Sequence, residues 1–328
     1  MIPWSEKTIL VTGGTGSFGK KFVEIALNRL KPKKLIVFSR DELKQYEMRQ
    51  KFDAKNIRYF IGDVRDANRL YRAFEGVDIV VHAAALKHVP IAEYNPFEVI
   101  QTNIIGAENV INAALDQGVE KIIALSTDKA ANPINLYGAT KLCSDKLFIT
   151  SNAYAGKKKT RSAVVRYGNV AGSRGSVIPY FKSLKKTGTI PITHEDMTRF
   201  FITLEQGVEF VIQSLNDMIG GELFIPKIPS VKIMDLKEAI APECKHTVTG
   251  IRPGEKLHEV LLPLEESRNA YEFDNMYVLE PHFDWWERTA FHAGGRKVSG
   301  DFEYNSKDNA WRLSIPEIRK LAESIRDE

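Results

Sequence analysis

A glycine-rich turn directly after the first predicted strand constrains the fold of this chain more than any other feature. The β-branched run Thr8–Thr12 is followed at once by Gly13-Gly14-Thr15-Gly16-Ser17-Phe18-Gly19, which opens a helical pattern. Glycines permit a tight turn and a close backbone approach, while the free N–H groups and the dipole of the following helix favour a pyrophosphate. Because a strand and a helix flank the glycines, the turn predicts a dinucleotide-binding unit.

The first half of the chain continues to alternate strands and helices. Strands are expected near residues 34–38, 57–61, 78–81, 121–125 and 162–166, and helices near 18–29, 42–52, 69–74, 97–117 and 136–155. Alternation at this spacing predicts an α/β fold with a doubly wound parallel Rossmann sheet, whose ligands bind at the carboxyl ends of the strands.

The pattern becomes irregular after about residue 170, where a smaller lobe is expected. A chain of 328 residues is long enough for two lobes. We expect a dinucleotide-binding Rossmann domain over residues 1–170, with returning segments near 195–226. Residues 171–328 are expected to form mainly a smaller mixed α/β lobe that binds the substrate, together with a C-terminal extension. Helices near 178–186 and 205–216 and a strand at 222–225 belong to this half.

Charge, apolar runs and cysteines exclude several classes of function. The 46 basic and 42 acidic residues are spread along the chain, so the net charge of +4 does not indicate nucleic-acid binding. The N-terminus lacks the apolar region of a signal peptide, and no apolar run approaches the roughly 18 residues of a membrane span. We therefore expect a cytoplasmic protein without a membrane partner. Cys143 and Cys244 lack metal-ligand spacing, which predicts no metal site and a small buried side chain at both positions.

The end of the second predicted strand indicates which dinucleotide is bound. An enzyme that uses NAD usually places an acid there, against the diol of the adenosine ribose. This chain has Ser39 and Arg40, which suit the 2′-phosphate of NADP. Two alternatives remain open, in which Arg40 is a solvated residue at a helix start and Asp41 is only an N-cap. The expected NADP contacts are Gly13, Thr15, Gly16, Ser17, Phe18, Gly19, Ser39, Arg40, Asp41, Lys44, Asp63, Val64, Ala83, Tyr137, Lys141 and Val170.

Candidate catalytic residues follow the fifth predicted strand. That strand runs into Ser126-Thr127-Asp128-Lys129, and the next helix carries Tyr137 and Lys141. Residues at i and i+4 share one helix face. The Lys141 ammonium, together with the positive charge of an oxidised nicotinamide, can lower the pKa of the Tyr137 phenol so that it accepts a proton near neutrality.

At these residues the chain resembles the extended short-chain dehydrogenases/reductases, and within them the inverting UDP-N-acetylglucosamine 4,6-dehydratases of the type that begins pseudaminic acid synthesis. The resemblance covers about residues 7 to 265. Its motifs are Ala83 to Pro90, Ser126 to Lys141, Arg166 to Val170 with Gly172 to Ser176, Met197 to Phe200, and Gly250 to Glu259.

The resemblance implies a task for each catalytic candidate. Tyr137 takes the proton of the sugar C4 hydroxyl while the C4 hydride passes to NADP. Lys129 then acts as the base at C5, Asp128 is the acid for the departing C6 hydroxyl, and the hydride returns to C6. Dehydratases that retain the C5 configuration commonly carry Glu at the position of Lys129. Inversion at C5 is therefore implied, with UDP-2-acetamido-2,6-dideoxy-beta-L-arabino-hex-4-ulose as the product. A basic lysine needs a lowered pKa, and burial near Lys141 together with the charge of the nicotinamide is expected to lower it.

A UDP-sugar substrate needs cations for its diphosphate and directed hydrogen bonds for uridine, and arginine suits phosphates geometrically. We also expect the chain to form a homo-oligomer. The substrate contacts that the resemblance implies are Lys87, Thr127, Asn169, Arg174, Arg199, Arg252 and Glu255.

Two other functions remain in competition. A UDP-hexosamine 4-epimerase keeps the glycine turn with Tyr137 and Lys141 but needs no acid or base at C5 and C6, so Asp128 and Lys129 argue against it. A non-catalytic NADP-binding regulator is compatible with the same fold, since fold does not fix function. Retention of all four candidate catalytic residues argues against the regulator.

Overall fold

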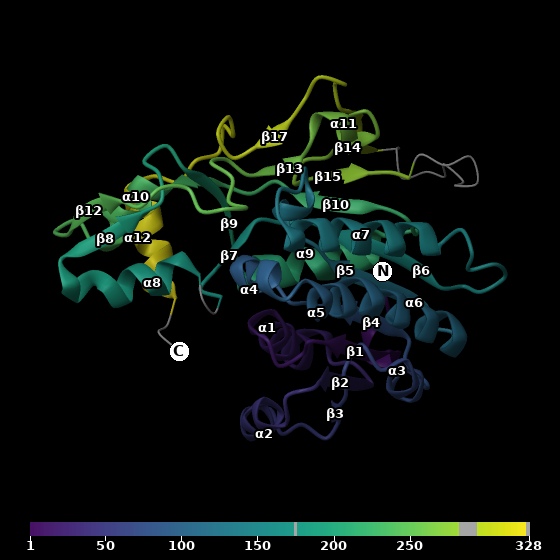
Figure 1. Ribbon diagram of the computed structural model, residues 1–328. Coiled ribbons are helices and arrows are strands. Elements are labelled where there is room, and N and C mark those ends of the chain that lie inside the picture. Colours follow the sequence, from purple (N-terminus) through teal and green to yellow (C-terminus); the bar gives the residue numbers. More distant parts are fainter. Residues whose placement is uncertain (174–175, 282–293, 326–328) are drawn as a thin grey trace.

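A ten-stranded sheet forms the centre of the computed structural model, which describes residues 1–173, 176–281 and 294–325 (Figure 1). The strand order is β16-β14-β15-β10-β6-β5-β4-β1-β2-β3. In chain order these strands are β1 (Thr8–Thr12), β2 (Lys34–Ser39), β3 (Ile57–Ile61), β4 (Ile79–His82), β5 (Lys121–Leu125), β6 (Arg161–Val165), β10 (Leu223–Pro226), β14 (Ala270–Glu272), β15 (Met276–Leu279) and β16 (Arg296–Lys297). The seven strands from β3 to β10 in the sheet pair in parallel, which confirms the predicted Rossmann sheet.

Helices cover both faces of this sheet. On one face α1 (Ser17–Ile25) packs against α9 (Leu204–Asp217), and on the other α6 (Gly106–Gln117) packs against α3 (Ala67–Ala73) and α7 (Leu136–Ser151). With helices on both sides, all five residues of β1 are buried, as expected for a strand in the middle of a parallel sheet. Further α-helices around the sheet are α2 (Glu42–Lys51), α4 (Val89–Tyr94), α5 (Pro96–Ile100) and α11 (Leu264–Ser267).

The C-terminal half returns to the main sheet further along the chain than residues 195–226. The strand β15 pairs antiparallel with β10, and β14 and β16 follow it. These strands contain only two to four residues, too few to show the alternation of apolar and polar residues from which a strand is predicted. Residues 270–279 and 296–297 lie after the expected boundary at about residue 170, yet they extend the sheet of the Rossmann strands.

A smaller body with its own apolar core lies beside the sheet (Figure 1). Ile178, Phe181, Ile190, Leu236 and Ile318 belong to this core. Its elements are α8 (Val177–Leu184), α10 (Ile233–Ile240), α12 (Ile315–Ser324), the β8–β12 pair (Thr189–Ile192 and Lys245–Val248) and the sheet β11-β9-β7 (Ser230–Lys232, Thr198–Thr203 and Asn169–Ala171). A further pair, β13 (Val260–Leu262) with β17 (Tyr304–Asn305), runs antiparallel.

The two cysteines differ in their exposure. Cys244 is 3% exposed, as predicted. The prediction for Cys143 is wrong, because its side chain is exposed on α7. Over the residues that the structure describes, no helix has the length and apolar character needed to cross a membrane, and His, Cys, Asp and Glu side chains form no group of three or more that could hold a metal.

Candidate active site

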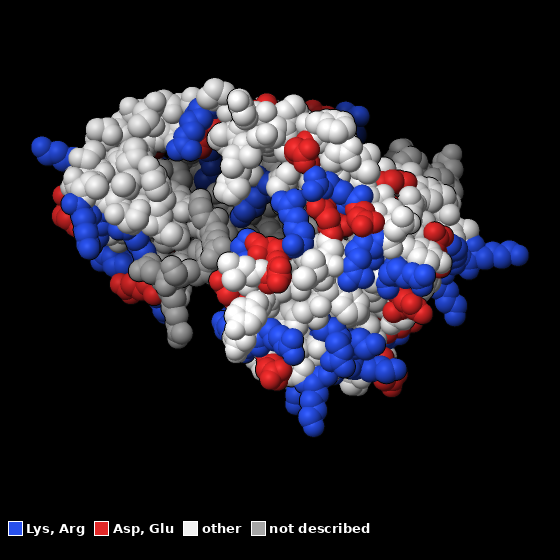
Figure 2. Space-filling view, turned by 60° about the horizontal axis from the view of Figure 1, so that its bottom comes forward, with Lys and Arg blue, Asp and Glu red and all other residues white. Residues whose placement is uncertain are grey.

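A cavity of about 690 Å³ opens where the parallel strands end, between the sheet and the smaller body. Figure 2 shows this face hollowed, with Lys and Arg side chains gathered around the opening. Every residue expected to contact NADP lines the cavity, and so do the four catalytic candidates Asp128, Lys129, Tyr137 and Lys141. Segments far apart in the sequence therefore meet in one place, as the doubly wound topology requires.

The glycine turn forms one wall of the cavity. Gly13 has a φ of +64°, and a Cβ there would lie 2.8 Å from the Ala84 backbone nitrogen. A side chain at this position would therefore be strained and would also clash with the loop after β4. The helix α1 begins at Ser17 with Gly16 as its N-cap, so its free N–H groups face the cavity. The turn fits the pyrophosphate of a dinucleotide.

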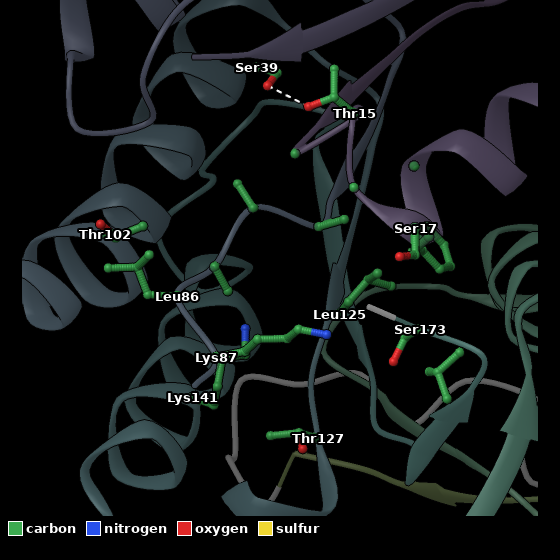
Figure 3. A pocket seen from close by; sticks show the side chains of 18 of the residues that line it. Thr15, Ser17, Ser39, Leu86, Lys87, Thr102, Leu125, Thr127, Lys141 and Ser173 are labelled. Atoms are coloured by element: carbon green, nitrogen blue, oxygen red, sulfur yellow. Dashed lines mark hydrogen bonds between the residues drawn. The ribbon is translucent and has the colours of Figure 1, made fainter. Parts of the chain in front are cut away.

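The end of β2 presents hydroxyl and cationic groups to the same cavity. The Ser39 and Thr15 hydroxyls are 2.8 Å apart (Figure 3). The Arg40 side chain is 55% exposed, and the ion pair that it forms with Asp63 is long at 3.6 Å. Asp41 accepts a hydrogen bond from the Lys44 N–H and is thus the N-cap of α2. Arg40 is therefore available to an anionic group placed at this wall.

Tyr137 and Lys141 lie on the face of α7 that borders the cavity, and they are 9% and 3% exposed. A Cβ on Gly138 would lie 2.1 Å from the Lys129 carbonyl oxygen, so glycine at this position lets the start of α7 pack directly against the Asp128–Ala130 turn. This contact places the Tyr137 phenol beside Asp128 and Lys129. Burial raises the pKa of Tyr137 to about 12, although Lys129 and a hydrogen bond with Thr127 oppose the rise.

Lys129 lies between two buried carboxylates. Its Nζ is 2.9 Å from Asp128 Oδ1 and 3.3 Å from Glu259 Oε1, while these carboxylates are 1% and 2% exposed. Burial lowers the pKa of Lys129, but the two negative charges outweigh it and the net pKa is raised. Burial thus acts in the expected direction, but the expectation that the pKa of Lys129 falls is wrong. Opposite charges within hydrogen-bond distance stabilise the ammonium more than burial disfavours it.

A second charge network lies behind Lys141. The Asp145 carboxylate, 1% exposed, accepts a 2.6 Å hydrogen bond from the Ser126 hydroxyl and lies 3.6 Å from the Arg166 guanidinium. Burial lowers the pKa of Lys141, and Asp145 opposes this effect. Asp145 was missed from the sequence, yet its place four residues after Lys141 on one helix face was a usable signal.

The predicted substrate contacts divide into two groups. Lys87, Thr127 and Asn169 line the cavity. Figure 3 shows Lys87 and Thr127 near Lys141, at the end away from the Thr15–Ser39 hydrogen bond. Burial lowers the pKa of Lys87, and the charge of Lys129 acts in the same direction. Arg174 lies outside the described residues.

The structure does not place Arg199, Arg252 or Glu255 in the lining of this cavity. The guanidinium of Arg199, 5% exposed, donates to the carbonyl oxygens of Thr198, Lys256 and Leu257 and pairs with Glu255 at 3.4 Å. The Arg252 side chain is 66% exposed. Arg199 thus holds the 255–257 loop, while a contact of Arg252 with substrate stays a prediction.

The family model described as "Polysaccharide biosynthesis protein" matches residues 9–281 of the chain. A UDP-N-acetylglucosamine 4,6-dehydratase (inverting) from Campylobacter jejuni subsp. jejuni serotype O:2 is 54% identical, over 97% of this chain and 98% of the relative. A UDP-glucose 4-epimerase from Rickettsia bellii is 40% identical, over 96% and 95%. The crystal structure of Pen from Bacillus thuringiensis is 38% identical, covers 98% of both chains and superimposes with a TM-score of 0.89.

Proposed function

The chain belongs to the polysaccharide biosynthesis protein family, and from this premise we propose that it is a C5-inverting UDP-N-acetylglucosamine 4,6-dehydratase that uses NADP. One observation carries the proposal. Asp128 and Lys129, which a dehydration needs and an epimerisation does not, share the cavity with Tyr137 and Lys141. The near full-length identity of 54% to an inverting dehydratase supports the same reaction.

The lining of the cavity fits a nicotinamide dinucleotide. The turn at Gly13, the N-terminus of α1 and the small side chain of Ala83 leave room for a pyrophosphate and a ribose. When bound, the nicotinamide accepts the C4 hydride of the sugar and later returns it to C6. Tyr137 takes the C4 hydroxyl proton, and the cation of Lys141 on the same helix face stabilises the phenolate that Tyr137 must become.

The acid and the base can be prepared by a single proton shift. Lys129 starts as an ammonium and Asp128 as a carboxylate, with 2.9 Å between Nζ and Oδ1. Moving one proton across this hydrogen bond gives a neutral amine, which can take the C5 proton, and a carboxylic acid, which can protonate the leaving C6 hydroxyl. Loss of water then restores the ammonium and the carboxylate, so the pair neither gains nor loses a proton over the elimination of water.

A time course by NMR spectroscopy with UDP-N-acetylglucosamine tests the proposed function. Dehydration converts the C6 hydroxymethyl group into a methyl group, and a reaction in deuterium oxide should place deuterium at C5. The coupling constants of the product should report inverted geometry at that carbon. A product that keeps its C6 hydroxyl and carries no deuterium at C5 would contradict the dehydratase.

A UDP-hexosamine 4-epimerase is the second candidate, because a UDP-glucose 4-epimerase is 40% identical over nearly the whole chain. It would use the glycine turn, Tyr137 and Lys141, and it would leave Asp128 and Lys129 without a chemical task. The same NMR time course separates the two, since the epimerase changes only the configuration at C4.

The choice of NADP rests on Arg40, and it predicts that Arg40→Ala weakens NADP binding while NAD binding stays nearly unchanged. A charge-assisted phosphate contact is worth on the order of 1.5–3 kcal/mol, so we expect a loss of roughly tenfold or more in affinity, measured by fluorescence titration. Arg49→Ala is the matched control, because Arg49 is exposed on α2 and does not line the cavity. Equal affinity of the unmutated protein for NAD and NADP would refute this choice.

Assembly of the chain with copies of itself is supported by an apolar surface. Ile91, Tyr94 and Phe97 on α4 and α5 are 58%, 87% and 65% exposed, and clustered exposed apolar side chains mark interaction surfaces. Sedimentation velocity measures the mass of the assembly, and a monomer at micromolar concentration would argue against a homo-oligomer.

A further inference from the structure

Glu259 carries a buried carboxylate that is not among the expected contacts of the cofactor or the substrate. It precedes β13 and is 2% exposed. Its backbone N–H donates to the Ser306 hydroxyl at 2.9 Å, and its carbonyl oxygen accepts from the Ser306 N–H at 2.8 Å. Burying a carboxylate is costly unless it is paired, so the position of Glu259 beside the turn of residues 128–135 (the catalytic turn) requires an explanation.

The segment that carries Glu259 docks on the catalytic turn at two further points. Lys256 Nζ donates to the Ala131 carbonyl oxygen at 2.5 Å, and Asn135 Nδ2 donates to the Gly254 carbonyl oxygen at 2.7 Å. The strand β13 itself packs against the Asp128–Ala130 turn. These contacts fix the Glu259 backbone relative to Lys129, and they leave its side chain aimed at the ammonium.

The Glu259 side chain makes its closest polar contact with Lys129. Its Oε1 is 3.3 Å from Lys129 Nζ and 3.8 Å from Arg199 Nε. Among the described residues, no group forms a hydrogen bond with Glu259 Oε2 or with Asp128 Oδ2. Lys129 is thus held by Asp128 on one side and Glu259 on the other, with Arg199 balancing part of the second negative charge.

We propose that Glu259 is a positioning residue of the dehydration, whose carboxylate holds the Lys129 ammonium against Asp128 and so retains on Lys129 the proton that Asp128 later delivers to the C6 hydroxyl. This inference rests on the proposed function. The N–H bond of Lys129 breaks as the O–H bond of Asp128 forms. The C5–H bond then breaks with its proton going to Nζ, its electron pair forms the C5–C6 double bond, and the C6–O bond breaks as Asp128 protonates the departing oxygen.

The charge of Glu259 determines how tightly Lys129 holds its proton. A carboxylate this close to an ammonium favours its charged form and so raises its pKa, and the pKa of Lys129 is raised here. Neutralising Glu259 removes that attraction. It also takes away one of the negative charges that balance the positive charge of Arg199, and both changes lower the pKa of Lys129. The titratable and charged groups that face Lys129 are Asp128, Glu259, Arg199, Tyr137, Lys87 and Lys256.

The experiment compares Glu259→Gln with Glu259→Asp in the full chain. Labelling with an amine-selective reagent at a fixed pH near 8, followed by mass spectrometry of the Lys129 peptide, measures the neutral fraction of Lys129. Below its pKa this fraction rises tenfold for each unit by which the pKa falls. We expect Lys129 to be labelled about tenfold faster in Glu259→Gln than in the unmutated chain, and at nearly the unmutated rate in Glu259→Asp, which keeps the charge.

Turnover of UDP-N-acetylglucosamine gives a second readout. Glu259→Gln should lower kcat by about tenfold or more with little change in KM, because a displaced base reacts poorly while substrate contacts persist. Glu259→Asp should recover part of this loss. If Glu259 acted in folding alone, both variants would change kcat and the labelling rate of Lys129 alike. The proposed role predicts instead that Lys129 is labelled faster only in Glu259→Gln, which lacks the charge.

A comparison within the unmutated chain keeps the inference testable if a variant does not fold. Lys87 lines the same cavity and has a lowered pKa, so we expect Lys129 to be labelled at least about tenfold more slowly than Lys87. Equal labelling of the two lysines, or a Glu259→Gln chain whose Lys129 is labelled at the unmutated rate, would overturn the inference. An unmutated chain that makes no methyl product would instead refute the proposed function, and the labelling rates would still report on Glu259.

Discussion

Replacing Lys129 by alanine is expected to leave oxidation at C4 intact and to stop the reaction before water is lost. In the proposed mechanism Tyr137 accepts the C4 hydroxyl proton, so this half-reaction does not need the Lys129 amine. The absorbance band of the reduced nicotinamide should therefore appear on adding substrate and persist, while NMR detects no methyl product. Loss of an acid or base step typically slows a reaction by about 100- to 10,000-fold, and we expect the overall dehydration to fall within this range.

The control for this variant has to account for the buried charges around Lys129. Removing the ammonium leaves Asp128 and Glu259, 1% and 2% exposed, without their shared cation, and breaking a buried pair is strongly destabilising. Lys129→Arg keeps the positive charge but cannot lose a proton near neutrality, so it should arrest the reaction at the same stage with less loss of thermal stability. Methyl product formed at the unmutated rate by either variant would remove Lys129 from the mechanism.

Replacing Tyr137 by phenylalanine is expected to stop the reaction one step earlier. This change deletes the oxygen that is proposed to take the C4 hydroxyl proton, so turnover should fall roughly 100-fold or more without appearance of the reduced nicotinamide. Burial raises the pKa of Tyr137 to about 12 before any ligand binds, and the positive charge of an oxidised nicotinamide lowers it. Since only the deprotonated phenol is a base, the rate of C4 oxidation should rise with pH up to the phenol's pKa in the complex, as measured by single-turnover absorbance.

Tyr154→Phe serves as the matched control for Tyr137→Phe. It removes the same hydroxyl from a tyrosine that is 50% exposed and does not line the cavity, so turnover should stay close to that of the unmutated chain. NADP and substrate should still bind to the Tyr137→Phe protein, as calorimetry would show. Reduction of the nicotinamide at the unmutated rate in Tyr137→Phe would mean that another group accepts the C4 proton.

The two acids around Lys129 explain why a lysine suits the position beside Asp128 better than a carboxylate would. A carboxylate beside Asp128 would add a third negative charge to a pocket that already holds Glu259. An ammonium there is instead stabilised by both acids and can pass its proton directly to Asp128. The raised pKa of Lys129 is thus compatible with a base that is prepared only when Asp128 takes up the proton.

Local sequence patterns were sufficient to predict the Rossmann sheet and most of the cavity. A strand, a glycine turn and a helix are neighbours in the chain, and the i, i+4 spacing of Tyr137 and Lys141 places both on one helix face. Each pattern expresses a short-range constraint, such as the positive φ of Gly13 or the burial of every residue in β1. Because parallel strands end at one edge of the sheet, residues after separate strands could be assigned to one site.

The charge state of the site was decided by tertiary structure. Glu259 and Lys129 lie far apart in the chain, and only the docking of the 254–256 loop and of β13 against the catalytic turn brings their side chains to 3.3 Å. The same packing occupies the Arg199 guanidinium with backbone carbonyl oxygens. The pKa of an ionisable group depends on how near other charges lie and how far water is excluded. Residue type and spacing therefore identified Lys129 as a candidate base, whereas the three-dimensional arrangement determined that it begins as an ammonium between two acids.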